Sequence, residues 1–164
     1  MTNNFVFEPD LAAKTIHIVR EFNAPIEKVW RAWTEAALIE KWAAPKPWKI
    51  VFKTFDFIVG GISLYAMTGP EGQRHWVYDE FTAIEKGSSF SQMGMFCDQE
   101  GNPATEGPKS YNVRQFSGIE GNRTKVDAVL TFEDEDTIKW FVEGGFKEGT
   151  TMTFDQLDEL LASQ

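Results

Sequence analysis

The chain has 164 residues with a net charge of −9, and 42% of its residues are hydrophobic. This length and composition predict one soluble globular domain without a membrane span. The negative charge argues against nucleic acid, because phosphate binding needs a basic patch, and against an anionic membrane surface. Cys97 is the only cysteine, and the start of the chain carries no signal-peptide pattern, so a cytoplasmic location without disulfides is expected.

The first fifty residues predict one strand followed by two short helices. Residues 14–22 alternate apolar and polar side chains, which is typical of a strand. Pro25 suits the first turn of the first helix, and Thr34 is expected to end that helix and to cap the second. The second helix carries Trp42 and stops before Pro45. The apolar stripe of the first helix consists of Ile26, Val29, Trp30 and Trp33.

The rest of the chain predicts a run of strands and then a helix. The turn-rich stretch 98–110 reads as a long hairpin loop inside this run. Residues from Ile138 onward predict a long C-terminal helix, and the acidic run 133–136 before it suits either a helix N-terminus or a solvated turn. The predicted strands are 48–57, 60–69, 74–85, 88–96, 110–120 and 123–133.

These elements predict an α+β fold built on one curved antiparallel sheet. Such a sheet must cover one of its faces, and the C-terminal helix is the only predicted element long enough to do so. We expect the sheet to wrap around that helix, with the two short helices closing one end. Trp30, Trp33 and Trp42 would then lie where these helices meet the mouth of the sheet.

The chain resembles the helix-grip, START-like superfamily and, within it, single-domain homologues of the activator of the 90-kDa heat-shock-protein ATPase. The resemblance covers 14–164 as one domain and leaves 1–13 as an N-terminal extension. It is carried by the order and spacing of several short motifs together. These motifs contain Arg20, Ala24-Pro25, Val29-Trp30, Trp33, Lys41-Trp42, Asp56, Gly60-Gly61, Glu80, Gly121, Thr124 and the C-terminal segment 144–162.

The resemblance implies a helix-grip fold with a deep apolar cavity between the sheet and the long helix. It implies no single activity, because fold and function separate in this superfamily. Its members bind lipids, polyketides or hormones, and a few are cyclases or hydrolases. The eukaryotic activator stimulates a chaperone with two domains, and this chain resembles only the second, which weighs against chaperone activation.

Nine residues are predicted to form much of the wall or rim of this cavity. Core packing is the stronger interpretation for Trp30 and Trp33, and a plain core remains open for the aromatic and Met residues of the strands. Gly145 and Gly149 allow either close packing on the sheet or room for a ligand. The strands carry bulky apolar residues on both faces, so one face could pack on a second subunit. The nine residues are Trp42, Trp48, Trp76, Tyr78, Met93, Met95, Phe146, Gly149 and Met152.

Candidates for catalysis are few. His17 and His75 are far apart and accompany no metal or nucleophile motif, so no metal site and no cofactor are predicted. Asp79 and Glu80 are adjacent on a strand, so one of them must face inward. A carboxylate inside an apolar cavity could act as an acid or base, whereas pairing with an arginine such as Arg20, Arg74 or Arg114 would make it structural.

The sequence therefore favours a module that binds a small apolar or amphipathic ligand, with a lipid-binding or stress-related role in view. A chaperone-associated regulator is the second hypothesis and rests on the resemblance alone. A cavity enzyme of the cyclase or hydrolase type, using Glu80 or Asp79, is the third, and a non-enzyme is favoured over it. A homodimer and a chaperone are left open as partners.

Overall fold

The computed structural model describes residues 4–103 and 109–163. In this part of the chain, eight strands form one antiparallel sheet and four helices accompany it. None of the described helices is both long and apolar enough to cross a membrane. In chain order the elements are β1 (Phe5–Asp10), β2 (Thr15–Phe22), α1 (Ile26–Thr34), α2 (Ala36–Trp42), β3 (Lys49–Phe55), β4 (Ile62–Thr68), β5 (Arg74–Glu85), β6 (Ser89–Cys97), β7 (Lys109–Ile119), β8 (Arg123–Phe132), α3 (Glu135–Glu143) and α4 (Phe146–Ala162).

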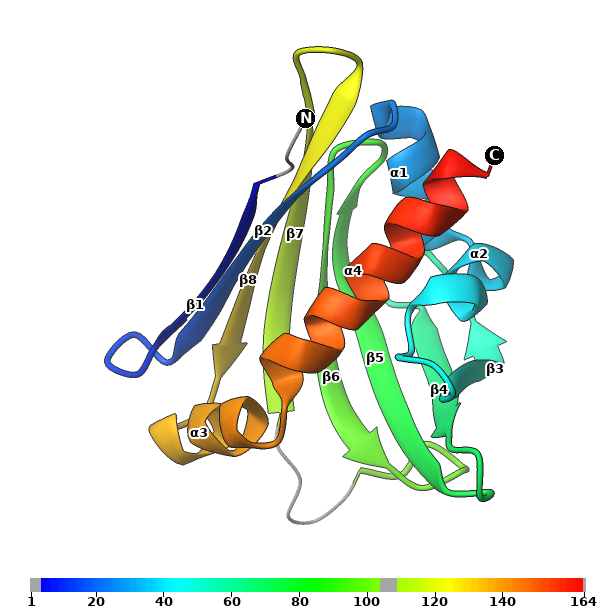
Figure 1. Cartoon of the computed structure of the whole chain (residues 1–164). Helices are drawn as coiled ribbons and strands as arrows, with labels where there is room; N and C mark the ends of the chain where they lie inside the picture. Colours follow the sequence, from blue (N-terminus) through cyan, green and yellow to red (C-terminus); the bar gives the residue numbers. More distant parts are fainter. Residues whose placement is uncertain (1–3, 104–108, 164) are drawn as a thin grey trace.

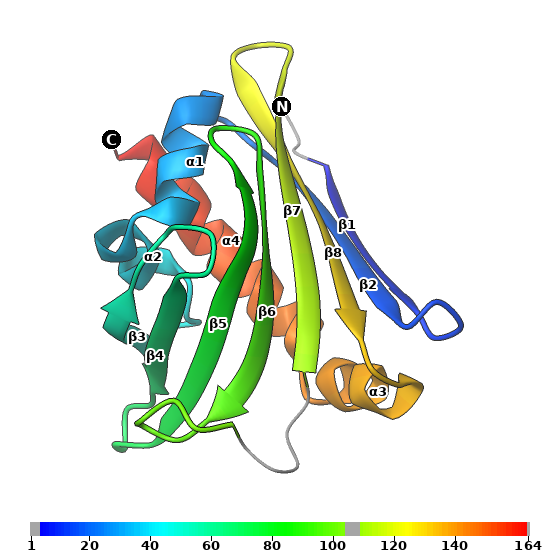
Figure 2. The same cartoon turned by 180° about the vertical axis from the view of Figure 1, so that it is seen from behind.

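The sheet is strongly curved, and α4 crosses its concave face (Figure 1). The strand order is β1-β2-β8-β7-β6-β5-β4-β3, so the chain runs along the sheet by hairpins except where β2 pairs with β8. The helices α1 and α2 lie at one end of α4, where α2 is next to β3 and α1 contacts β7 and β8, and α3 lies at the other end. The view from behind shows the convex face of the sheet with α4 on its far side (Figure 2). The predicted helix-grip architecture is confirmed.

Two predicted helix boundaries differ from the structure. The long C-terminal helix is two helices, because the chain turns at Gly145, where φ is +92°. Thr34 does not cap α2: its hydroxyl donates to the carbonyl of Trp30, 2.9 Å away, and Glu35 occupies the cap position. The acidic run does start a helix, since the side chain of Asp134 accepts a hydrogen bond from the Thr137 amide at 2.8 Å.

The first strand lies in the segment that the sequence analysis places outside the resemblance. Residues 5–10 pair with β2 in antiparallel register, with Phe5 opposite Arg20 and Phe7 opposite Ile18. The rings of Phe5 and Phe7 pack edge-on against Phe154 and Phe146 of α4. This segment therefore extends both the sheet and the core beneath one half of α4.

The tryptophans of the first helix belong to an aromatic cluster. Trp30 makes edge-to-face contacts with Phe57, Phe90 and Phe116 at centroid distances of 5.9, 5.9 and 5.1 Å. Its side chain is buried, and it helps to join α1 to the sheet. The prediction that Trp30 packs in the core is confirmed. Aromatic pairs of this geometry add about 0.5–1.5 kcal/mol each beyond the area they bury.

Polar contacts hold α4 to the rest of the molecule at two places. The guanidinium of Arg20 on β2 donates to Asp158 at 2.6 Å and to Asp155 at 3.1 Å. The amide of Gln156 donates to the carbonyls of Trp42 and Ala44 at 2.9 and 2.8 Å, just past the end of α2. Together they fix the position of α4 over the sheet and so set the space left between them.

Candidate functional site: a cavity between the sheet and the C-terminal helix

A cavity of about 310 Å³ lies between the concave face of the sheet and the helices α2 and α4. This is near the lower end of the volumes of pockets that hold small organic ligands. Most of the wall is apolar, and much of it is aromatic. The aromatic residues of the wall, apart from Tyr65, are Trp33, Trp42, Phe52, Phe55, Phe81, Phe90, Phe146 and Phe154.

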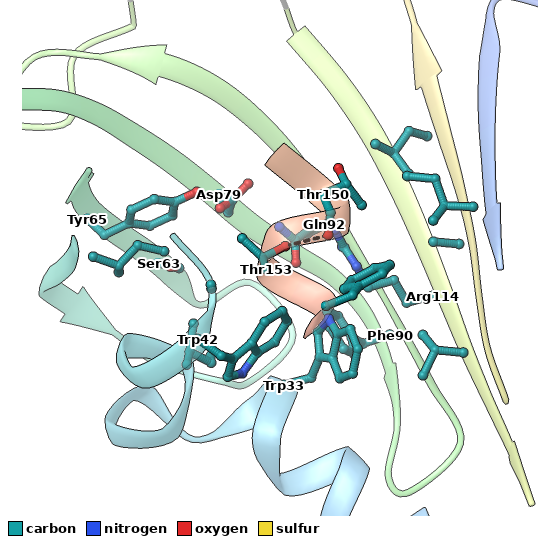
Figure 3. Close-up of a pocket in the computed structure, with 18 of the residues that line it drawn as sticks. Trp33, Trp42, Ser63, Tyr65, Asp79, Phe90, Gln92, Arg114, Thr150 and Thr153 are labelled. Atoms are coloured by element: carbon teal, nitrogen blue, oxygen red, sulfur yellow. Dashed lines mark hydrogen bonds between the residues drawn. The ribbon is translucent and has the colours of Figure 1, made fainter. Parts of the chain in front are cut away.

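Trp33 and Trp42 form the wall on the side of α1 and α2 (Figure 3). Their rings are 4.7 Å apart and inclined by 63°. The indole nitrogen of Trp42 donates to the carbonyl of Ala32 at 2.9 Å, so its polar atom is satisfied inside the protein. What these two rings offer the cavity is therefore a fixed apolar surface.

Polar side chains from four neighbouring strands face the same cavity. Tyr65 comes from β4, Asp79 from β5, Gln92 from β6 and Arg114 from β7. Because they come from successive strands, these four side chains form a polar strip across the concave face (Figure 3). Ser63, Thr150 and Thr153 add hydroxyl groups to the wall from β4 and α4.

Asp79 is the most buried charged group of the polar strip, with 6% of its surface exposed. Burial raises its pKa to about 6, although the charge of Arg114 and a hydrogen bond from the Gln92 side chain both lower it. Burial also raises the pKa of Tyr65, and the charge of Asp79 raises it further. Tyr65 is therefore a neutral hydroxyl near neutral pH, while Asp79 can hold or release a proton.

A glycine makes room for this carboxylate. Asp79 pairs with Gly94 on β6, and a Cβ atom built on Gly94 would lie 2.4 Å from Oδ1 of Asp79. A side chain at this position would displace the carboxylate. A glycine inside a strand is a sequence signal for such a close approach, and here it marks the position opposite the inward-facing acid.

Among the described residues, Arg114 has no partner of opposite charge at ion-pair distance. The ion pairs between described residues join other groups, and none includes Arg114 or Asp79. The guanidinium carbon lies 5.9 Å from the ring centroid of Phe90. Burial lowers the pKa of Arg114, and the charge of Asp79 opposes that effect.

A buried acceptor lies beside the polar strip. Asn112 on β7 is opposite Gln92 on one side and Leu130 on the other, and both of those neighbours line the cavity. Asn112 is 7% exposed, and nothing among the described residues donates to its Oδ1 atom. Buried acceptors are nearly always satisfied, so this atom calls for a donor such as a water molecule or a bound group.

Of the nine predicted wall residues, the structure brings Trp42 and Phe146 to this cavity. Trp76, Tyr78, Met93 and Met95 lie on the convex face instead, as the register with the inward-facing Asp79 requires. Trp48 stacks on His75 at 5.7 Å and lines a separate surface hollow beside β3. Gly149 faces Pro45, whose Cγ would lie 3.7 Å from an added Cβ, and Met152 is 46% exposed.

On the convex face, Tyr78 lies under the loop that follows β6. The loop after β6 covers this part of the sheet, so that a Cβ added to Gly101 would lie 3.6 Å from the Tyr78 ring and 3.7 Å from Leu64. The predicted hairpin loop, residues 98–110, lies partly outside the described residues, and its described part places Gly101 next to these two side chains on the outer face. Of the two adjacent acids, Asp79 lines the cavity, and Glu80, which pairs with Met93 on β6, is not among its wall residues.

The inner wall also contains residues that the sequence alone does not mark as cavity residues. Gln92 and Ser63 each lie on one face of an alternating strand, but nothing in a single sequence shows that this face lines a cavity. Arg114 was named only as a partner for a carboxylate. Across the described ranges, no three His, Cys, Asp or Glu side chains converge in a way that could hold a metal ion.

Most of the chain matches a known protein family. Residues 23–162 match the family described as "Activator of Hsp90 ATPase homolog 1-like protein". The chain belongs to this family. No curated protein matches it. The predicted resemblance is confirmed at the level of the family.

Solved structures of bacterial proteins are similar to this chain over nearly its whole length. A protein from Arthrobacter aurescens is 31% identical with a TM-score of 0.88, covering 97% of this chain and 92% of that one. A protein from Mycobacterium smegmatis is 31% identical with a TM-score of 0.87, covering 96% and 97%. A protein from Rhodobacter sphaeroides, 20% identical with a TM-score of 0.84 and covering 98% and 100%, shares the fold.

Proposed function

We propose that this chain binds a small ligand with a mainly apolar body in the cavity between the sheet and α4. The observation that carries the proposal is a cavity of about 310 Å³ whose wall is mostly apolar side chains from both layers. Burying apolar surface there contributes about 25 cal/mol per Å², less the cost of association. The family membership supports a ligand-binding or regulatory role without naming a ligand.

The wall offers a position where the cavity can be filled. Ala128 on β8 is 6% exposed and lines the cavity, so a leucine there would occupy ligand space. Ala83 on β5 is exposed and lies outside the wall, so the same substitution there leaves the cavity unchanged. Ala128→Leu and Ala83→Leu therefore form a matched pair.

The test uses the neutral fluorescent probe N-phenyl-1-naphthylamine. The wild-type chain and Ala83→Leu should bind it saturably at one site, with energy transfer from tryptophan. Ala128→Leu should remain folded, as judged by circular dichroism, and lose at least about tenfold in probe affinity because its side chain fills ligand space. Equal binding by all three proteins, or none by the wild type, would overturn the proposal. Native mass spectrometry of freshly purified protein would identify any retained ligand.

A second candidate function is acid–base catalysis by Asp79. The specific observation is its position in the cavity wall with a pKa of about 6, close to the pH at which a general acid or base is most effective. Glu80 is not part of this candidate, because it lies outside the wall. If a retained ligand is converted on incubation, Asp79→Asn should bind it and leave it unconverted. Full conversion by Asp79→Asn would exclude this role.

A further inference from the structure

The charge of Arg114 is the feature of the cavity that an apolar ligand leaves unexplained. Its side chain lines the cavity beside Phe90, and none of the ion pairs of the described residues includes it. An arginine stays protonated in proteins, and a charge in apolar surroundings is costly unless it is paired. Five donors in a planar fork match the two oxygens of a carboxylate.

We propose that the cavity is specific for small amphipathic monoanions, with the ligand's carboxylate held by Arg114 and its hydrocarbon body against Trp33 and Trp42. This inference rests on the proposed function and names its ligand class. Among the described wall residues, Arg114 is the only arginine or lysine, and Asp79 shares the same wall. One cation beside an acid suits a single negative charge and disfavours a dianion such as a phosphate monoester.

Asp79 would couple this binding to a proton. The charged or titratable groups that interact with it are Arg114 from β7, Tyr65 from β4 and Cys97 from β6, and Gln92 and Thr153 add neutral groups. A bound carboxylate would pair with Arg114 and place a like charge near Asp79. Both changes raise the pKa of Asp79 above the value of about 6 that burial gives it in the free protein.

The ligand is therefore expected to bind together with one proton. Protonated Asp79 can donate a hydrogen bond to the ligand's carboxylate, which the ionised form cannot do. Affinity for the anion should fall as the pH rises above about 6, with a slope approaching tenfold per pH unit until the pKa of the complex is reached. A neutral ligand of the same length should show no such dependence.

The experiment is isothermal titration calorimetry with octanoate, 1-octanol and octylamine. Octanoate should bind the wild type most tightly, and at pH 7 its proton uptake, measured in two buffers of different ionisation enthalpy, should be positive. Arg114→Gln should weaken octanoate by at least about tenfold and change 1-octanol by less than about twofold, as loss of a charge-assisted pair implies. Arg31→Gln, at a surface arginine that is 63% exposed, is the matched control and should leave both unchanged.

Asp79→Asn should bind octanoate more tightly than the wild type at pH 7.5 and lose the pH dependence. Preference for octylamine, or equal weakening of octanoate and 1-octanol by Arg114→Gln, would overturn the inference. If Arg114→Gln does not fold, the order of the three ligands and the sign of the proton uptake still decide it. Binding of 1-octanol but not octanoate removes this inference alone, whereas failure of all three probes and of N-phenyl-1-naphthylamine removes the proposed function too.

Discussion

Burying Asp79 in the cavity wall has an electrostatic cost that depends on pH. Burial raises its pKa from 3.8 to about 6, so the folded state holds this proton more tightly than the unfolded chain does. The free energy of unfolding contributed by this group is therefore highest below pH 4 and falls as the pH rises through about 6. Over the whole window the fall is on the order of 3 kcal/mol.

Asp79→Asn should remove that dependence. Relative to the wild type, the variant should gain stability as the pH rises from 5 to 7.5, by on the order of 1 kcal/mol, because part of the transition lies below pH 5. Urea unfolding of both proteins at the two pH values measures the difference. The comparison uses the change in the free energy of unfolding between the two pH values. Any pH-independent effect of removing the negative charge beside Arg114 cancels in that difference. Parallel pH profiles of the two proteins would show that Asp79 is not protonated in this range.

We expect that residue 94 must be glycine because the Asp79 carboxylate occupies the space of a side chain there. The backbone of the strand does not itself require a glycine. Gly94→Ala should cost about 1–3 kcal/mol, because the new Cβ would lie 2.4 Å from Oδ1 of Asp79. In an Asp79→Ala background most of that cost should disappear, since the oxygen is absent. Gly118→Ala on β7 is the control, because a Cβ there meets nothing within 4 Å. Strictly additive effects of the two substitutions would contradict the close approach.

At the scale of elements, Arg20 is the main polar connection between β2 and α4. Its side chain is 10% exposed, and rings of Phe5, Phe22 and Phe154 surround its guanidinium at 5.5 to 5.9 Å. Arg20→Gln should lower the free energy of unfolding by about 2 kcal/mol, less than a fully buried pair would lose, because Asp155 is 63% exposed. Chemical denaturation measures the loss. Arg31→Gln, which breaks an exposed pair with Glu35, should cost less than about 1 kcal/mol, and equal losses would show that Arg20 does not anchor the helix.

Element types were largely predictable because the hydrophobic period changes clearly along the chain. The strand predicted at 74–85 matches β5, and the apolar stripe of α1 is the face that packs in the core. The break before α4 was missed because apolar residues continue through it, although Gly145 provides the left-handed turn. The first strand was missed because its alternation spans only Phe5 to Phe7 before Pro9.

The site was less predictable, because alternation shows that a strand has two faces without showing which one is inside. On β5, size favoured Trp76 and Tyr78 as inward residues, but Asp79 and Phe81 line the cavity. On the outer face, Gly101 in the loop after β6 lies next to Tyr78. This contact joins segments that are distant in the sequence, so local sequence patterns do not indicate it. Trp42 and Phe146 do line the cavity, and each lies on an element whose place the topology fixes.

At the scale of the whole molecule, the cavity lies where the helices and the concave face of the sheet are not in contact. Core clusters lie on both sides of it: one joins α1 and the C-terminal half of α4 to the sheet, and the other joins β1 and α3 to β2 and β8. The walls between them come from strands β2 to β8 and from α1, α2 and α4. A ligand in this space would add contacts between the layers, where the protein alone has few.

Ligand binding should therefore protect the helical layer and the cavity strands, but not the sheet edge. With N-phenyl-1-naphthylamine at 100 times its dissociation constant, openings that release the probe become less favourable by about 2.7 kcal/mol. Amide hydrogen exchange in α4, measured by mass spectrometry, should slow by up to about 100-fold wherever exchange needs α4 to leave the sheet. The edge strand β1 has no wall residue, so exchange through its local fraying should not change. Ala128→Leu serves as the control and should show no protection by the probe. Uniform slowing that includes β1, or unchanged exchange in α4, would mean that the probe does not bind between the layers.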